Sequence, residues 1–244
     1  MSSTKTVAFE VCVETPQGIA ACQGLADRIE LCSGLDLGGL TPSHGLMRLA
    51  KDSGIETHVL IRPRAGDFSM SQHDLAVASA DIAAVREMGL QGVVIGAVKN
   101  DALDTDAIAT MIDAAEGLDL TLHRAFDVVA DRTAALEQAI DLGFRRVLTS
   151  GGSPTAPDGA KEIQRLYTQS KGRIEIMAGS GISPTNLHRL LEETKCDAIH
   201  ASCTSHRNIQ HDYEWMGFGS AARHTDPEKV RMIAKALQTQ KVNA

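Results

Sequence analysis

The sequence lacks the features that mark several classes of protein. No Pro/Ser-rich linker, charge run or low-complexity segment divides its 244 residues, so we expect one domain over residues 1–244. It has no basic stripe and no aromatic stacking platform, and its net charge is −7, which argues against a nucleic-acid partner. A small anionic ligand is still allowed, because local arginines and lysines decide anion binding and the net charge does not.

Segments for membrane insertion or export are missing as well. No apolar run approaches the roughly 20 residues of a membrane span, and residues 1–6 contain no signal-peptide apolar core. The 5 cysteines are odd in number and include no C-x-x-C pair, which fits a reducing cytosol better than a disulfide framework. We therefore expect a cytoplasmic protein without a membrane partner.

Short apolar runs recur along the chain and are separated by segments with helical spacing. The predicted strands are Val7–Val13, Arg28–Cys32, Thr57–Ile61, Gly92–Ile95, Asp119–His123, Arg146–Thr149, Ile174–Met177 and Asp197–Ala201. A repeated βα unit of roughly 20–35 residues with apolar strands predicts a parallel sheet covered by helices. Eight such units favour a closed (β/α)₈ TIM barrel. An open doubly wound sheet is the alternative, but no G-x-G-x-x-G turn follows the first strand.

Several helix starts carry a capping residue. A polar side chain precedes proline at Thr15-Pro16, Thr41-Pro42, Ser183-Pro184 and Asp226-Pro227. The oxygen can accept an early helical N–H, while proline occupies the first turn, where its missing donor costs nothing. Asp131 is expected to cap a fifth helix.

Polar residues stand where the predicted strands end. Active sites of TIM barrels lie at these carboxyl ends, so we expect one shared pocket whose catalytic candidates are Glu10, Glu30, Arg62, His123 and His200. Imidazole titrates near neutral pH and suits acid–base chemistry. The alternative is a structural ion-pair network among Glu10, Glu30 and Arg62, with both histidines satisfied in the core.

Glycine-rich turns follow the sixth and seventh predicted strands. Glycines let backbone N–H groups approach an anion, and barrels often bind phosphate near strands seven and eight. Tight βα turns use glycine in any case, so both explanations stand. Asp67 could ligate a metal or brace Arg64. The ligand-binding candidates are Arg64, Asp67, Arg124, Asp127, Thr149, Ser150, Gly151, Gly179, Ser180, Gly181 and Ser202.

The metal-binding candidates are two cysteines. No H-E-x-x-H motif, carboxylate triad or Cys/His quartet is present, so a structural zinc site is not expected. Cu(I) accepts two thiolates, and Cys12 and Cys32 lie on adjacent predicted strands, which are roughly 5 Å apart in a sheet. The alternative is that both thiols are inert core residues, as buried cysteines usually are. A long segment, 202–225, is expected near the barrel mouth or on a second subunit.

Several stretches together resemble the CutC family of copper-homeostasis proteins. They are F-E-V-C-V-E (9–14), A-D-R-I-E-L-C-S-G-L (26–35), G-G-L-T-P-S-H-G (38–45), I-R-P-R-A-G-D-F (61–68), H-R-A-F-D (123–127), L-T-S-G-G (148–152) and I-M-A-G-S-G-I (176–182). The resemblance implies a cytosolic (β/α)₈ barrel, commonly a homodimer, with Cys12 and Cys32 as proposed Cu(I) ligands. Three positions depart from the family pattern: Glu14 replaces the usual Asp, Ser180 interrupts a G-G-G loop, and Cys203 replaces a small residue.

The first functional hypothesis is therefore copper homeostasis through Cu(I) binding by cysteine thiolates. The second is a TIM-barrel enzyme, a lyase, isomerase or hydrolase that acts on an anionic small molecule, with phosphorylated compounds among the candidates. The strand ends carry more polar groups than a two-thiolate carrier needs, which favours the enzyme, whereas the family resemblance favours copper handling. Copper handling is placed first, with the enzyme as the alternative. A third hypothesis, a ligand sensor that signals through a dimer, finds no partner-binding helix or tail in the sequence.

Overall fold

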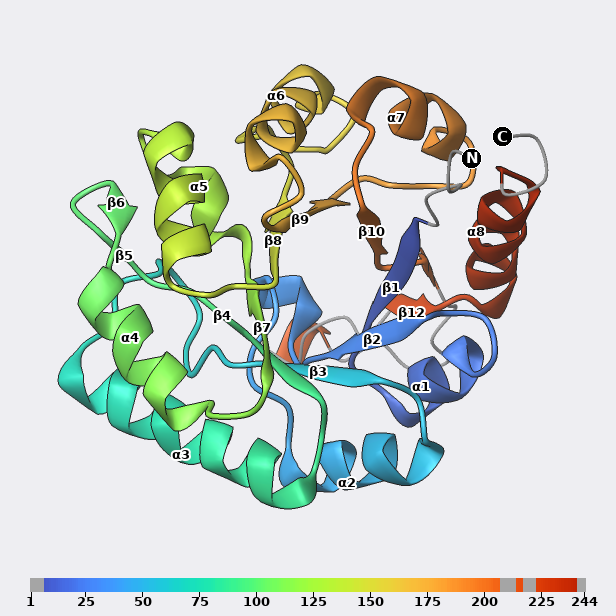
Figure 1. The fold of residues 1–244 in the computed structure, drawn as a ribbon. Coiled ribbons are helices and arrows are strands. Elements are labelled where there is room, and N and C mark those ends of the chain that lie inside the picture. Colours follow the sequence, from blue (N-terminus) through green and yellow to red (C-terminus); the bar gives the residue numbers. More distant parts are fainter. Residues whose placement is uncertain (1–6, 207–213, 217–222, 241–244) are drawn as a thin grey trace.

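Eight parallel strands close into a barrel in the computed structural model, which describes residues 7–206, 214–216 and 223–240 (Figure 1). Strand β10 pairs with β1 and closes the sheet. The predicted (β/α)₈ TIM barrel is thus confirmed, and the open sheet is excluded. Each predicted strand matches an observed one to within a residue or two: β1 (Ala8–Val13), β2 (Arg28–Leu31), β3 (Thr57–Leu60), β4 (Gly92–Ile95), β7 (Asp119–Leu122), β8 (Arg146–Thr149), β9 (Glu175–Gly179) and β10 (Ala198–Ala201).

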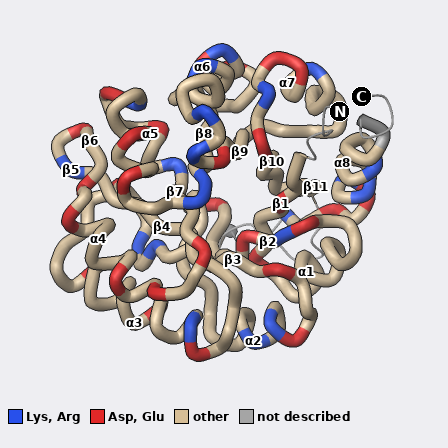
Figure 2. The backbone as a smooth tube through the Cα atoms, in the orientation of Figure 1, with Lys and Arg blue, Asp and Glu red and all other residues tan. Residues whose placement is uncertain are grey.

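A ring of helices surrounds the strands (Figure 1). Figure 2 shows basic and acidic positions interspersed around this ring. Within the described ranges, no helix is long and apolar enough to cross a membrane. The helices are α1 (Pro16–Cys22), α2 (His44–Ser53), α3 (Gln72–Met88), α4 (Thr105–Ala114), α5 (Arg132–Asp141), α6 (Ala160–Ser170), α7 (Leu187–Thr194) and α8 (Pro227–Gln240).

The predicted helix starts are confirmed in part. Thr15 caps α1, Asp131 caps α5, and α8 begins at Pro227. Thr41 does not cap α2, because its hydroxyl accepts the Arg62 N–H and its own N–H donates to the Arg62 carbonyl. Ser43 caps that helix instead.

The start predicted at Ser183-Pro184 is also wrong. Those residues form a turn, and α7 begins only at Leu187. The Asn186 side chain holds the turn, since it accepts the Ser183 N–H and donates to the Gly181 carbonyl.

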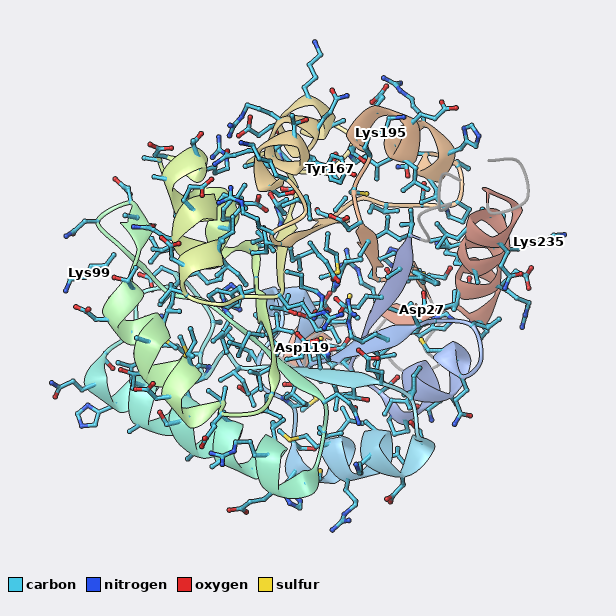
Figure 3. All side chains as sticks on the ribbon, viewed as in Figure 1. Asp27, Lys99, Asp119, Tyr167, Lys195 and Lys235 are labelled. Carbon is cyan, nitrogen blue, oxygen red and sulfur yellow. The ribbon has the colours of Figure 1, made fainter. Side chains whose placement is uncertain are left out.

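The barrel has an apolar outer layer and an interior in which polar groups lie beside two small apolar clusters. Alternation along each strand sends Phe9, Val11 and Val13 toward the helices, where they join the main hydrophobic core. The same alternation sends Glu10 and Cys12 inward. Side chains fill the centre of the barrel in Figure 3.

An ionic cluster occupies the amino-terminal ends of the strands. Arg146 is 2% exposed, and its guanidinium donates to Asp119 and Glu175 at 3.1 Å. Its Nη1 also lies 3.3 Å from His58 Nδ1. Asp119 and Glu175 neutralise the buried Arg146 guanidinium, so structural charge pairs close this end of the barrel.

Short helices and strands lie on the side of the barrel where the carboxyl ends of its strands are found. They are the 3₁₀ helices η1 (Leu35–Leu37), η2 (Arg124–Val128) and η3 (Glu214–Met216), the hairpin of β5 (Val98–Lys99) with β6 (Ala102–Leu103), and the ribbon of β11 (Thr204–His206) with β12 (Arg223–Thr225). The ribbon joins the two ends of the predicted long segment 202–225. Residues 207–213 and 217–222 of that segment lie outside the described residues.

Candidate functional site

A cavity of about 350 Å³ opens at the carboxyl ends of the barrel strands. This is the end at which TIM barrels place their active sites. Four of the five predicted catalytic residues line it, and Glu10 lies fully buried near them. The lining residues are Cys12, Glu14, Glu30, Leu35, Gly38, Leu60, Arg62, Phe68, His123, Arg124, Leu148, Ser180, Gly181, Ile182, His200, Ala201, Ser202, Thr204 and Arg223.

Strand register decides which side chains meet at the inner end of the cavity. Glu10 stands opposite Arg28, and Cys12 stands opposite Glu30, in the pairing of β1 with β2. Cys32 is therefore one inward-facing step nearer the mouth than Cys12. The group that comes together is Cys12, Glu30 and His200, whose sulfur, carboxylate oxygen and ring nitrogen all lie within 4.8 Å of one another.

His200 is held between two carboxylates. Its Nδ1 lies 2.7 Å from Glu10 Oε1, and its Nε2 lies 3.7 Å from Glu30 Oε2. Burial alone would lower the pKa of His200, but Cys12, Glu10 and Glu30 raise it well above the usual value. These neighbours therefore favour the protonated form of the imidazole.

Glu10 is stabilised as a carboxylate by Arg28. The Arg28 Nε donates to Glu10 Oε2 at 2.5 Å, and Glu10 has no exposed surface. Burial acts to raise the pKa of Glu10, yet Arg28 and then His200 hold it well below the usual range. The predicted alternative paired Glu10 with Arg62, whereas its guanidinium partner is Arg28.

Arg28 was not among the predicted site residues. The signal that identifies it is the alternation Arg28-Ile-Glu30-Leu-Cys32, which places all three polar side chains on the inner face of β2. Arg28 also approaches Glu56 and the sulfur of Met177, each at 3.7 Å.

Glu30 has a carboxyl group that titrates near neutral pH. Burial raises its pKa to about 7, since the opposing effect of His200 is only partial and Glu10 adds repulsion. The Cys32 thiol faces this residue, with its sulfur 3.6 Å from the Glu30 carbonyl oxygen and 3.9 Å from Oε2. Burial and then Glu30 raise the pKa of Cys32 well above the usual value, so Cys32 carries a protonated thiol. Cys203 is likewise buried, and burial raises its pKa to about 12.

Arg62 and His123 form another part of the cavity wall, around Phe68. The guanidinium carbon lies 5.3 Å from the Phe68 ring centre, and the His123 ring lies 5.0 Å from it. His123 Nδ1 accepts the Ala125 N–H at 3.1 Å. Burial and then Arg62 lower the pKa of His123 to about 4, so this imidazole is neutral at pH 7.

The turn after β8 already holds an anion, which is the chain's own Asp127. Its carboxylate accepts the Thr149 hydroxyl at 2.5 Å, the Ser150 N–H at 3.0 Å and the Gly152 N–H at 3.1 Å. Arg124 pairs with the same carboxylate at 2.8 Å. These predicted anion-binding groups therefore satisfy one another. Gly151 adopts φ +69°, and a side chain there would meet the Gly159 carbonyl oxygen at 2.4 Å, which accounts for the glycine.

The remaining predicted anion-binding residues lie away from the turn after β8. Arg64 is half-buried and pairs with Asp67 at 3.0 Å and with Asp74 at 3.3 Å, so Asp67 braces Arg64. Neither Arg64 nor Asp67 lines the 350 Å³ cavity. Ser180, Gly181 and Ser202 do line it, and Gly179 ends β9 beside them.

Comparisons with known proteins agree on one family. The sequence profile of the CutC family matches residues 7–205. A Rhizobium meliloti (strain 1021) protein named as a family protein CutC is 46% identical over 236 residues, which cover 95% of this chain and 96% of that protein. A protein of the same name from Caulobacter vibrioides (strain NA1000 / CB15N) is 50% identical over 202 residues, 82% of each chain.

A solved structure extends the match to three dimensions. The crystal structure of a Streptococcus agalactiae protein that carries the name copper homeostasis protein CutC superposes with a TM-score of 0.77 at 32% identity. The match covers 80% of this chain and 98% of that one. Sequence profile, relatives and structure coincide, and this chain belongs to the CutC family.

Proposed function

We propose that the barrel mouth is the active site of an enzyme that performs acid–base chemistry on a small anionic molecule. The observation that carries the proposal is the convergence of Cys12, Glu30 and His200 within 4.8 Å in a cavity of about 350 Å³. Buried titratable groups are costly unless they are paired, and in clefts they are typical of catalytic sites. The reaction class is a lyase, isomerase or hydrolase reaction, each of which needs a proton to be moved.

Glu30 and His200 are suited to different parts of that chemistry. A carboxyl group with a pKa of about 7 can both donate and accept a proton at neutral pH, which assigns general acid–base catalysis to Glu30. Protonated His200, fixed by Glu10 at 2.7 Å, supplies a charged N–H that can stabilise negative charge developing on the substrate. Glu10 would then act as a positioning residue.

Proton exchange with solvent tests this function without a known substrate. Small carboxylates and phosphate esters with exchangeable C–H bonds are incubated with the protein in D₂O, and loss of the C–H signal is followed by ¹H NMR. We expect at least one compound to exchange with wild type and exchange to fall by about 10²-fold or more in Glu30→Gln. Glu87→Gln, at an exposed position of α3, is the matched control and should exchange like wild type. Exchange that survives Glu30→Gln would remove Glu30 from the mechanism.

Copper handling is the second candidate, because the Streptococcus agalactiae relative is named for it and because a thiol and an imidazole lie together here. Cys12 and His200 are donors of the kind that Cu(I) accepts, and Glu10 on Nδ1 resembles the outer carboxylate that orients a metal-binding histidine. The expected pair of Cys12 and Cys32 fits less well, since their register differs by one inward step and Cys32 faces Glu30.

A competitive Cu(I) titration under reducing conditions separates these possibilities. A two-thiolate site loses affinity in both Cys12→Ser and Cys32→Ser. A Cys12–His200 site loses affinity in Cys12→Ser and His200→Gln but not in Cys32→Ser. Weak binding that ignores all three substitutions would leave acid–base chemistry as the function of the cavity.

A further inference from the structure

Three arginines line the cavity, and they differ in how their charge is neutralised. Arg124 pairs with Asp127 at 2.8 Å, and Arg223 faces Asp36 at 3.5 Å. Arg62 has no carboxylate within ion-pair distance among the residues that the structure describes, although the residue is only 9% exposed. Within the described part of the chain, the wall of the cavity therefore holds a buried cation without a carboxylate partner.

The hydrogen bonds of Arg62 leave part of its guanidinium unused. Nη1 donates to the Leu37 and Gly39 carbonyls at 3.0 and 2.7 Å, and Nη2 donates to the Gly66 carbonyl at 2.7 Å. A guanidinium has five N–H donors, so these three bonds leave two. One of them is Nε, which is buried and has no partner in the described chain. Nε and Nη2 share the edge of the planar group that receives a carboxylate side-on.

The three carbonyls fix Arg62 but do not neutralise it. They come from the loop that contains η1 and from the loop after β3, so the guanidinium is held rigidly before any ligand arrives. Burial and then Arg64 lower the pKa of Arg62, which is the effect of a cation that lacks an acidic neighbour. Arg28 has such a neighbour, and although burial acts to lower its pKa, Glu10 raises it overall.

His123 supplies a second, uncharged donor on the same wall. Its Nδ1 accepts the Ala125 N–H, so in the neutral ring the proton is on Nε2. A neutral imidazole beside Arg62 adds a hydrogen bond without repelling the guanidinium. The wall thus offers one positive charge and a neighbouring N–H.

We propose that Arg62, with His123, anchors a carboxylate group of the substrate. One unneutralised charge matches a monoanion, whereas a phosphate monoester carries about −1.5 to −2 at pH 7 and needs further cations. The other two arginines of the cavity are paired, the turn after β8 is filled by Asp127, and Glu14 and Glu30 add negative charge. The inference rests on the proposed acid–base function and specifies its substrate class as small carboxylic acids.

Isothermal titration calorimetry on the full chain tests the anchor by binding alone. The probes are sodium acetate, glycolate and pyruvate, with inorganic phosphate as the comparator at equal ionic strength. We expect at least one carboxylate to bind saturably at one per chain and at least tenfold more tightly than phosphate. Arg62→Lys should weaken that binding at least tenfold, because lysine keeps the charge and loses the planar fork. Arg64→Lys, on the same loop and outside the cavity, is the matched control and should bind like wild type.

Three results would overturn the proposal that Arg62 anchors a carboxylate. Phosphate could bind more tightly than every carboxylate, or carboxylate binding could be the same in wild type and Arg62→Lys. The third result is that no carboxylate saturates the protein up to 50 mM, a limit that corresponds to about 1.8 kcal/mol of binding free energy. Should Arg62→Lys fail to fold, the ¹H–¹⁵N resonance of Arg62 Nε in wild type decides, since it must shift as carboxylate is added. Glu30→Gln separates this proposal from the function on which it rests. That variant should lose proton exchange and keep carboxylate binding, so failure of the chemistry and failure of the anchor give different results.

Discussion

At the scale of single residues, the site depends on which buried charges have partners. Glu10 is fully buried and is balanced by Arg28 on one oxygen and by His200 on the other. Among the described residues, the hydrogen-bond partners of the Arg62 guanidinium are backbone carbonyls. The charge of Glu10 is therefore neutralised within the protein, whereas the charge of Arg62 would be neutralised by the carboxylate of the proposed substrate.

Removal of the Arg28 guanidinium should expose the cost of a buried carboxylate. We expect Arg28→Met to lower the free energy of unfolding by about 3–5 kcal/mol, because Glu10 would keep its charge without its main partner. Urea denaturation measures the loss. The double variant Glu10→Gln/Arg28→Met should be less destabilised than Arg28→Met, and equal losses would contradict the pairing.

Part of this site could be predicted from the sequence. Strand alternation and barrel topology place Glu30, Arg62, His123 and His200 at one mouth, which is where the structure has them. The register in which two neighbouring strands pair cannot be read from the sequence of either strand alone. The opposition of Cys12 to Glu30, and the step between Cys12 and Cys32, therefore required the structure.

At the scale of elements, side chains from one loop hold the next. Asp127 in η2 binds the hydroxyl and N–H groups of the turn after β8, and Thr41 binds both backbone groups of Arg62. Hydroxyl residues and glycines in a turn are typical of anion sites, and a threonine before a proline is typical of a helix cap. The sequence pattern therefore indicates anion binding and helix capping as readily as it indicates a loop brace. Only the tertiary partner shows that Asp127 and Thr41 brace loops.

The Asp127 brace gives a prediction at this scale. Asp127→Asn replaces an acceptor oxygen by a donor that faces the N–H groups of Ser150 and Gly152, and it removes the charge that pairs with Arg124. We expect a loss of about 2–3 kcal/mol in the free energy of unfolding. Asp52→Asn, at an exposed position of α2, is the control and should change it by less than about 0.5 kcal/mol. A similar small change in Asp127→Asn would show that the brace is dispensable.

At the scale of the whole molecule, the two ends of the barrel differ in how their charges are satisfied. Arg146 and its acidic partners close the amino-terminal ends of the strands. The carboxyl-terminal mouth keeps a partly protonated acid and an arginine that has no carboxylate partner among the described residues. The barrel and its strands could be predicted because eight βα units of similar length have few other ways to bury their apolar faces. Dimer formation stays a prediction from the family resemblance, to be measured by light scattering.

Global stability should depend on pH through Glu30. Its folded-state pKa of about 7 lies above the ordinary value of 4.5, so its contribution is fully present below that ordinary value and is lost as pH rises through about 7. Relative to Glu30→Gln, wild type should lose on the order of 3 kcal/mol between about pH 4.5 and pH 8. Glu10 acts in the opposite direction, since its lowered pKa gives stability that is lost only in acid. Urea denaturation across this range measures the Glu30 contribution, and parallel profiles for the two proteins would rule out a perturbed Glu30.

The central claim is that the barrel mouth holds a carboxyl group that can exchange a proton at neutral pH. The most direct measurement is a ¹³C NMR titration of glutamate side-chain carboxyls in wild type and in Glu30→Gln. We expect one wild-type resonance to titrate near pH 7 and to be missing in the variant. If Glu30 instead titrates near the ordinary value of 4.5, it is fully ionised at neutral pH, and the assignment of acid–base catalysis to this residue is wrong.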